Sequence, residues 1–169
     1  MRFNIKHHIK DIIYGANDGI ITTFAVVAGV AGADLSATTT LIIGMSNLFA
    51  DGFSMAVSDY LGTKSEHEAM NSGGEKEGKE SHHPKLSAVI TLIAFVVAGS
   101  IPLWSYIVGS GSLSIASWSS AGALFLVGST RSIVTGKHFL RSGFEMLILG
   151  GLAAIIAYAV GAFVKSIVG

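Results

Sequence analysis

The chain has 169 residues, of which 50% are hydrophobic and 13% charged, and its mean hydropathy is +0.60. These values exclude an ordinary soluble domain and favour an integral membrane protein. The formal net charge is zero and cysteine is absent, so nothing indicates a nucleic-acid partner, and disulfides and thiolate metal sites are excluded.

Five membrane-spanning helices are predicted. A helix needs about 20 predominantly apolar residues to cross the hydrocarbon core of a bilayer. Asp, Glu, Lys and Arg are all absent from residues 86–130, so this segment is expected to cross twice. We therefore expect residues 1–169 to form a single all-α transmembrane domain. Its spans are predicted at about 12–32, 36–60, 87–109, 114–135 and 145–165.

The positions of Lys and Arg predict the orientation of the chain. Ten of the eleven lie before the first span, between the second and third, or from the end of the fourth span to the start of the fifth, and the eleventh, Lys165, lies at the end of the fifth span. The positive-inside rule then predicts a cytosolic N-terminus and a C-terminus on the opposite side. The N-terminal segment has no small-residue cleavage site and is expected to be retained. We expect the cell (inner) membrane if the protein is prokaryotic, and a vacuolar or other endomembrane if it is eukaryotic.

The first span contains Asp18, and the second contains Asp51 and Asp59. A carboxylate near the bilayer centre costs roughly 2.5–3.5 kcal/mol on the most lenient scale, so it usually faces a partner, a cavity or an ion path. No Lys or Arg lies within these two spans. Unneutralised acids favour bound protons or a metal cation, which indicates transport. The alternative for Asp18 is a hydrogen bond within a broken helix, or a pair with Lys10.

A polar stripe is predicted on the second span, where Asn47, Asp51, Met55 and Asp59 recur every four residues. Positions i and i+4 lie on the same face of a helix. Carboxylates combined with a thioether suit borderline divalent transition metals better than Mg or Ca. Core packing is the alternative role for Met55, and a solvated interfacial acid is the alternative for Asp59.

The hydrophilic segment 62–85 is predicted to be a cytosolic linker. Its first part, through Met70, could continue the second span as a helix, whereas Ser72 and the two glycines after it are typical of a flexible linker. Its carboxylates and imidazoles, with a second His pair on the same side, could collect divalent metal. A solvated charged loop is the alternative. The residues concerned are Glu66, Glu68, Glu75, Glu77, Glu80, His67, His82 and His83, with the pair His7 and His8.

Small residues recur at four-residue spacing in the first span, as in Gly15 with Gly19 and in Ala25, Gly29 and Ala33. This spacing lets helix backbones approach closely in lipid, either within the chain or at a dimer seam. Pro102 is expected to bend the third span, because its ring removes one backbone hydrogen bond.

Three motifs together resemble the vacuolar iron transporter family, including its nodulin-like and bacterial members. They are IIYGANDGIITTFAVVAGVAGA, FADGFSMAVSDYLGTKSEHE and RSGFEMLILGGLAAIIAYAVG. The resemblance implies a homodimer of five-helix subunits that exports Fe(II), and often Mn(II), from the cytosol in exchange for protons. It implies that the path is lined by the first two helices at the dimer interface.

The resemblance also assigns residues. Asp18 and Met55 match the aspartate of NDG and the methionine of SMA. The resemblance also implies an acidic residue farther along the second helix. Asn47 stands where plant-like members often have Glu, so Asp51 is inferred to take over the carboxylate role.

Iron-storing members carry a long Glu-rich domain that segment 62–85 replaces here, although Glu66 and Glu68 lie near where that domain would begin. The predicted metal-site residues are thus Asp18, Asn47, Asp51, Met55, Asp59, Glu66 and Glu68.

The leading hypothesis is a proton-coupled divalent metal transporter whose partners are the bilayer, a second copy of the chain and the metal ion, with no resident cofactor. The alternative is a membrane scaffold or metal-responsive partner protein that binds ions without moving them. An enzyme is disfavoured, since no nucleophile and base pair is evident.

Overall fold

The computed structural model describes residues 5–72, 83–136 and 138–168. These residues form helices and contain no strand, which confirms the predicted all-α class. The helices in chain order are α1 (Ile5–Gly32), α2 (Ala37–Ser72), α3 (Pro84–Gly99), α4 (Trp104–Ile107), α5 (Leu113–Thr135) and α6 (Phe139–Val168).

Four helices in the described part of the chain are long and apolar enough to cross a membrane, so the protein is an integral membrane protein. These candidate spans are His8–Gly32, Ala37–Ala69, Leu113–Ile133 and Phe139–Val168. The helical continuation of the second predicted span through Met70 is confirmed, since α2 extends to Ser72.

The third predicted span, 87–109, is interrupted instead of merely bent. α3 has 16 residues and ends at Gly99, and the chain then turns through residues 100–103 before the four-residue helix α4. Pro102 lies buried inside this turn. A proline lacks the amide hydrogen that would continue the helix and clashes with the preceding turn, which accounts for the break at this point.

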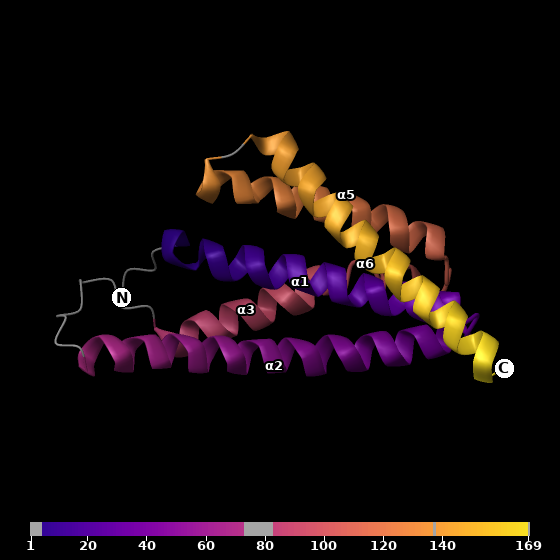
Figure 1. The fold of residues 1–169 in the computed structure, drawn as a ribbon, viewed down its shortest axis with the longest axis horizontal. Coiled ribbons are helices and arrows are strands. Elements are labelled where there is room, and N and C mark those ends of the chain that lie inside the picture. Colours follow the sequence, from indigo (N-terminus) through magenta and orange to yellow (C-terminus); the bar gives the residue numbers. More distant parts are fainter. Residues whose placement is uncertain (1–4, 73–82, 137, 169) are drawn as a thin grey trace.

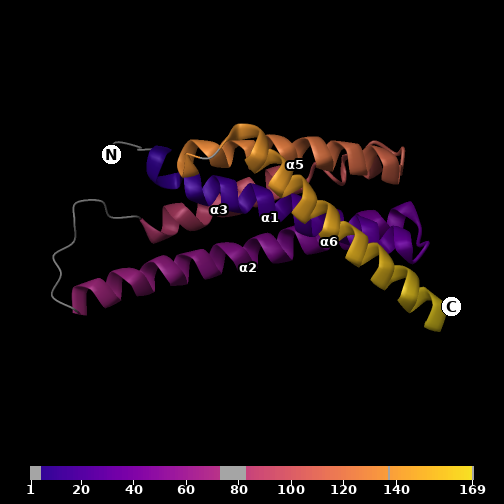
Figure 2. The same ribbon diagram turned by 45° about the horizontal axis from the view of Figure 1, so that its top comes forward.

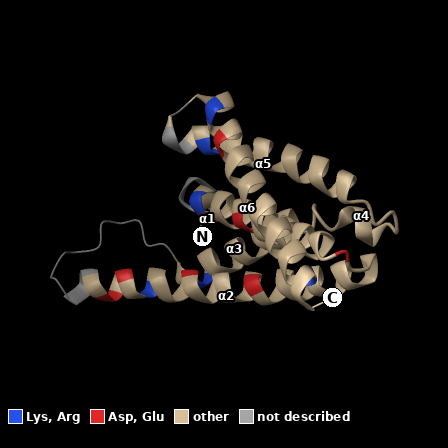
Figure 3. Cartoon of the chain, turned by 45° about the vertical axis from the view of Figure 1, so that its right-hand side comes forward, with Lys and Arg blue, Asp and Glu red and all other residues tan. Residues whose placement is uncertain are grey.

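α1 is the central helix of the bundle, and it packs against α2, α3, α5 and α6. α3 also contacts α2, and α5 forms an antiparallel pair with α6 (Figures 1 and 2). The beginning of α1 and the end of α6 lie at opposite ends of the molecule (Figure 1). Figure 3 shows Lys and Arg at the beginning of α1 and at the connection between α5 and α6, with acidic residues repeated along α2.

Glycines allow α1 to pack closely within the chain. A Cβ on Gly19 would collide with the backbone of Phe95 in α3, and one on Gly161 of α6 would collide with the backbone of Gly29. A Cβ on Gly15 would lie 2.7 Å from the carbonyl oxygen of Thr91. Gly15, Gly19 and Gly29 of the first span therefore allow close helix packing within one subunit.

An ion pair connects the turn between α1 and α2 to the end of α6. Asp34 has a positive φ of 56°, a conformation that Asp tolerates better than most residues. Lys165 Nζ donates a hydrogen bond of 2.8 Å to Asp34 Oδ2, and this hydrogen bond, with the nearby positive charge, lowers the pKa of Asp34 below its ordinary value. Both side chains are exposed, so the pair contributes little to stability.

Candidate functional site

A cavity of about 490 Å³ lies between α1 and α2, and most of the predicted metal-site residues line it. Asp18 comes from α1, whereas Asp51, Met55, Asp59 and Glu66 come from α2. Five of the seven predicted residues therefore share one cavity, here called the acidic cavity. Its other lining residues are Lys10, Tyr14, Ser54, Ser58, Gly62 and Thr63.

Helical periodicity explains this lining. Lys10, Tyr14 and Asp18 are spaced four residues apart on α1, and residues i and i+4 lie on the same helix face. On α2, Asp51, Met55 and Asp59 repeat the same spacing. Two facing stripes thus form the two walls of the acidic cavity.

Two predicted residues lie elsewhere. Asn47 is half-buried and belongs to the same stripe of α2, but it does not line the acidic cavity. Glu68 is exposed, also lies outside the cavity, and has its Oε1 3.7 Å from Lys64 Nζ one turn away. Metal binding by either residue stays a prediction.

The two aspartates that face each other across the cavity each precede a glycine packed against α3. A Cβ on Gly19 would meet the backbone of Phe95, and a Cβ on Gly52 would lie 3.1 Å from the ring of the same residue. Phe95 is fully buried between them. Because both glycines face α3, the preceding residues, Asp18 and Asp51, are turned about 100° away from that contact.

Met55 has a double environment. It is half-buried and packs against the core cluster that contains Leu48 and Phe95, yet it also lines the acidic cavity. The two alternatives proposed from sequence, core packing and a soft ligand, are therefore compatible in one side chain.

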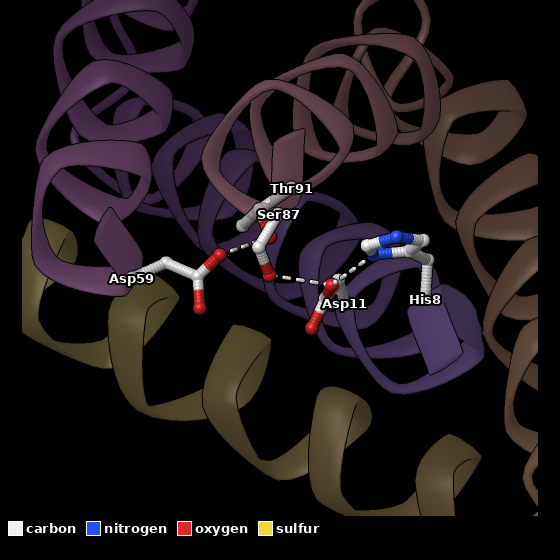
Figure 4. A network of polar contacts seen from close by, with 5 residues as sticks. All are labelled: His8, Asp11, Asp59, Ser87 and Thr91. Carbon is white, nitrogen blue, oxygen red and sulfur yellow. Dashed lines mark hydrogen bonds and ion pairs between the residues drawn. The ribbon is translucent and has the colours of Figure 1, made fainter. Parts of the chain in front are cut away.

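Hydroxyl groups of α3 hold carboxylates of the two neighbouring helices (Figure 4). Thr91 Oγ1 donates a hydrogen bond of 3.1 Å to Asp59 Oδ2. One turn earlier, Ser87 Oγ donates a hydrogen bond of 2.5 Å to Asp11 Oδ2, which also lies 3.1 Å from His8 Nδ1. Asp11, Ser87 and Thr91 were not predicted as site residues. A Ser and a Thr at i and i+4 in an apolar helix were the available signal.

His8 lies within α1, and its part in a metal-collecting cluster with the linker stays a prediction. Its side chain is buried and contacts Asp11 within α1. The predicted ligands Glu75, Glu77, Glu80 and His82 lie outside the described residues.

A second cavity, of about 430 Å³, lies on the side of α1 that faces α5 and α6. Its walls are mainly apolar, and the buried Oδ1 of Asn17 has no hydrogen-bond partner in the structure. Lys10, Tyr14 and Asp18 line this cavity as well as the acidic cavity. Asp18 is therefore accessible from two sides of α1. The remaining lining residues are Ile13, Asn17, Ile21, Arg131 and Met146.

The described acidic side chains do not form a complete metal site. Among the described residues, no group of three or more His, Asp or Glu side chains is arranged to hold a metal ion. The acidic cavity thus offers a series of oxygen ligands along one wall and one opposing carboxylate, without a complete coordination shell.

Comparisons with known proteins identify the chain. The family model described as the VIT family matches residues 9–85 and 73–162. The chain belongs to the VIT family. The two matched segments overlap at residues 73–85, within the linker.

Several relatives of the chain are vacuolar iron transporters. The chain is 24% identical to the vacuolar iron transporter of Toxoplasma gondii over 229 aligned positions, which cover 96% of this chain and 76% of the relative. It is 26% identical to vacuolar iron transporter 1 of Arabidopsis thaliana, covering 96% of this chain and 88% of the relative. Both belong to a family of transporters, so this VIT-family chain is related to proteins that move iron across a membrane.

Replacing Met55 by Leu is expected to change the order of preference among Fe(II), Mn(II) and Mg(II) more than it changes stability. The substitution removes the thioether but conserves volume, and such swaps usually cost less than about 1.5 kcal/mol. Competition between the ions in a flux assay measures the preference, and thermal unfolding measures the stability. An unchanged preference would show that Met55 only packs.

Proposed function

We propose that this VIT-family protein exports divalent transition metal, Fe(II) or Mn(II) or both, from the cytosol in exchange for protons. The observation that carries the proposal is the acidic cavity, in which Asp18, Asp51 and Asp59 accompany Met55 between two membrane-spanning helices. Carboxylates are hard ligands that also accept protons, and the thioether adds a soft ligand that favours transition metals. The relatives named as vacuolar iron transporters support iron as one cargo.

The working unit is proposed to be a homodimer. The acidic cavity lies between α1 and α2, and within the part of the chain that the structure describes, no three His, Asp or Glu side chains are grouped to hold an ion. A second copy related by two-fold symmetry would bring an identical set of acids to the same path, because such an interface places the same surface patch on both subunits. Incomplete coordination within one chain is what supports the dimer.

Each subunit is proposed to cross the membrane five times, with α3, the following turn and α4 together making the third crossing. The N-terminus would be cytosolic and the C-terminus on the other side. The cations at the beginning of α1 and at the connection between α5 and α6 support this orientation (Figure 3). The membrane is proposed to be a vacuolar or other endomembrane in a eukaryote and the cell membrane in a prokaryote.

The test is metal flux in proteoliposomes that contain the purified protein and an internal pH dye. Fe(II), Mn(II), Mg(II) and Ca(II) are supplied in turn. We expect flux of the transition metals above that of protein-free vesicles. Saturable metal binding without any flux would overturn transport and favour a metal-binding scaffold.

A proton gradient directed against the metal movement is expected to accelerate metal flux. Metal binding to carboxylates requires their deprotonation and so releases protons, which makes an acid-lined path suited to exchange. The measurement compares initial rates with and without a pH gradient at a clamped membrane potential, while the dye reports proton movement. Equal rates without proton movement would indicate a uniporter or channel.

A further inference from the structure

Thr91, a buried residue of α3, donates a hydrogen bond to Asp59, which lines the acidic cavity. We propose that Thr91 is a positioning residue for metal capture, because it holds the carboxylate of Asp59 in the orientation that metal requires. The inference rests on the proposed transport function. It adds a residue that lies outside the cavity lining and on a helix that contributes nothing to that lining.

The contacts of Thr91 fix it between the two helices that form the cavity. Its side chain is 1% exposed. Its carbonyl faces Gly15 of α1, where a Cβ would lie only 2.7 Å away, and its hydroxyl donates the 3.1 Å hydrogen bond to Asp59 Oδ2 of α2. The close approach to α1 restricts the position of the Thr91 backbone. The hydroxyl that donates to Asp59 is therefore held in place.

This attachment restricts one oxygen of the carboxylate. Asp59 Oδ2 accepts the bond from Thr91, whereas the second oxygen points away from α3 (Figure 4). Asp59 lines the acidic cavity. Outer-shell hydrogen bonds of this kind orient metal ligands, and their loss typically reduces metal affinity about 10- to 100-fold.

The same helix provides an internal comparison. Ser87, one turn before Thr91, makes the equivalent bond to Asp11. Asp11 does not line the acidic cavity. Both bonds join α3 to a neighbouring helix, but only that of Thr91 reaches a cavity residue. If the two hydroxyls had only a structural role, loss of either hydrogen bond would have the same effect on the apparent KM for metal. If Thr91 is a positioning residue, only loss of its hydrogen bond raises the KM.

The experiment measures initial rates of Mn(II) flux in proteoliposomes over a range of Mn(II) concentrations. Thr91→Val keeps the shape and removes the hydroxyl. We expect it to raise the apparent KM for Mn(II) about tenfold or more, with the maximal rate retained. Thr91→Ser keeps the hydroxyl and should restore the KM of the unmodified protein. If Thr91→Val fails to fold, Thr91→Ala carries the same expectation.

Two control variants separate positioning from packing. Thr23 of α1 is as buried as Thr91, but its hydroxyl has no hydrogen-bond partner in the structure, so Thr23→Val makes the same chemical change without breaking a bond. Ser87→Ala breaks the bond to Asp11 alone, and we expect it to lower thermal stability. The KM should be unchanged in both controls.

A double-mutant cycle with Asp59→Asn tests whether Thr91 acts through Asp59. In the Asp59→Asn background, Thr91→Val should raise the KM no further. The inference is overturned if Thr91→Val leaves the KM unchanged, or if it raises the KM equally with and without the Asp59 carboxylate. Failure of the unmodified protein to move Mn(II) or Fe(II) would instead overturn the proposed function, so the two failures are distinguishable.

Discussion

Asp18→Asn and Asp51→Asn are each expected to reduce metal flux by at least about 10- to 100-fold, the loss typical even for outer-shell residues of metal sites. The two carboxylates line the acidic cavity from opposite helices. Asn preserves the shape of the side chain but removes both the negative charge and the exchangeable proton. Flux of Fe(II) and Mn(II) in proteoliposomes measures the effect.

The matched control is Asp34→Asn, because Asp34 is an exposed acid in the turn between α1 and α2 and lies outside the cavity. It should transport normally. All three variants should reconstitute as well as the unmodified protein, because none of the changes alters side-chain volume substantially. Near-normal flux in Asp18→Asn or Asp51→Asn would remove that residue from the proposed path.

The second large effect is expected for Gly161→Ala. The added methyl group would collide with the backbone of Gly29 where α6 crosses α1, and a backbone atom cannot move aside as the end of a side chain can. Overpacking typically costs about 1–3 kcal/mol, occasionally more. We therefore expect a lower yield of folded protein and a lower unfolding temperature in detergent.

Gly151→Ala is the matched control for Gly161→Ala. Gly151 lies in the same helix, and no atom lies within 4 Å of the position that its Cβ would occupy. The Gly151→Ala variant should be at least as stable as the unmodified protein, because Ala is favoured over Gly in a helix interior by roughly 0.5–1 kcal/mol. Equal stability of the two variants would contradict the close crossing of α1 and α6.

The stripe of acids on α2 could be predicted from the sequence because helical periodicity alone relates Asp51, Met55 and Asp59. Periodicity within one helix says nothing about its neighbour, so the expectation that Asp18 shares a path with them came from the family resemblance, and the tertiary structure was needed to show that they line one cavity. The glycines after Asp18 and Asp51 explain that arrangement only once Phe95 is seen to pack against both.

Other features gave weaker signals. Ser87 and Thr91 are uncharged residues in an apolar helix, so their carboxylate partners on two other helices could not be predicted. Pro102 did indicate a disturbance of the third span. A proline is compatible with either a kink or a helix end. In the structure Pro102 is buried in the turn before α4, so the helix ends there.

The length of α2 has a consequence for the hydration of the ion. With 36 residues, α2 is about 54 Å long, whereas the hydrocarbon core is about 30 Å thick. Asp51 and Glu66 both line the acidic cavity, and their separation along the helix axis is about 22 Å. If Asp51 lies near the bilayer centre, Glu66 therefore lies outside the hydrocarbon core, at the aqueous edge of the headgroup region. An ion entering beside Glu66 would meet the carboxylates of Asp59 and then Asp51 in succession, and it could exchange its water molecules one by one instead of losing the whole hydration shell at the membrane surface.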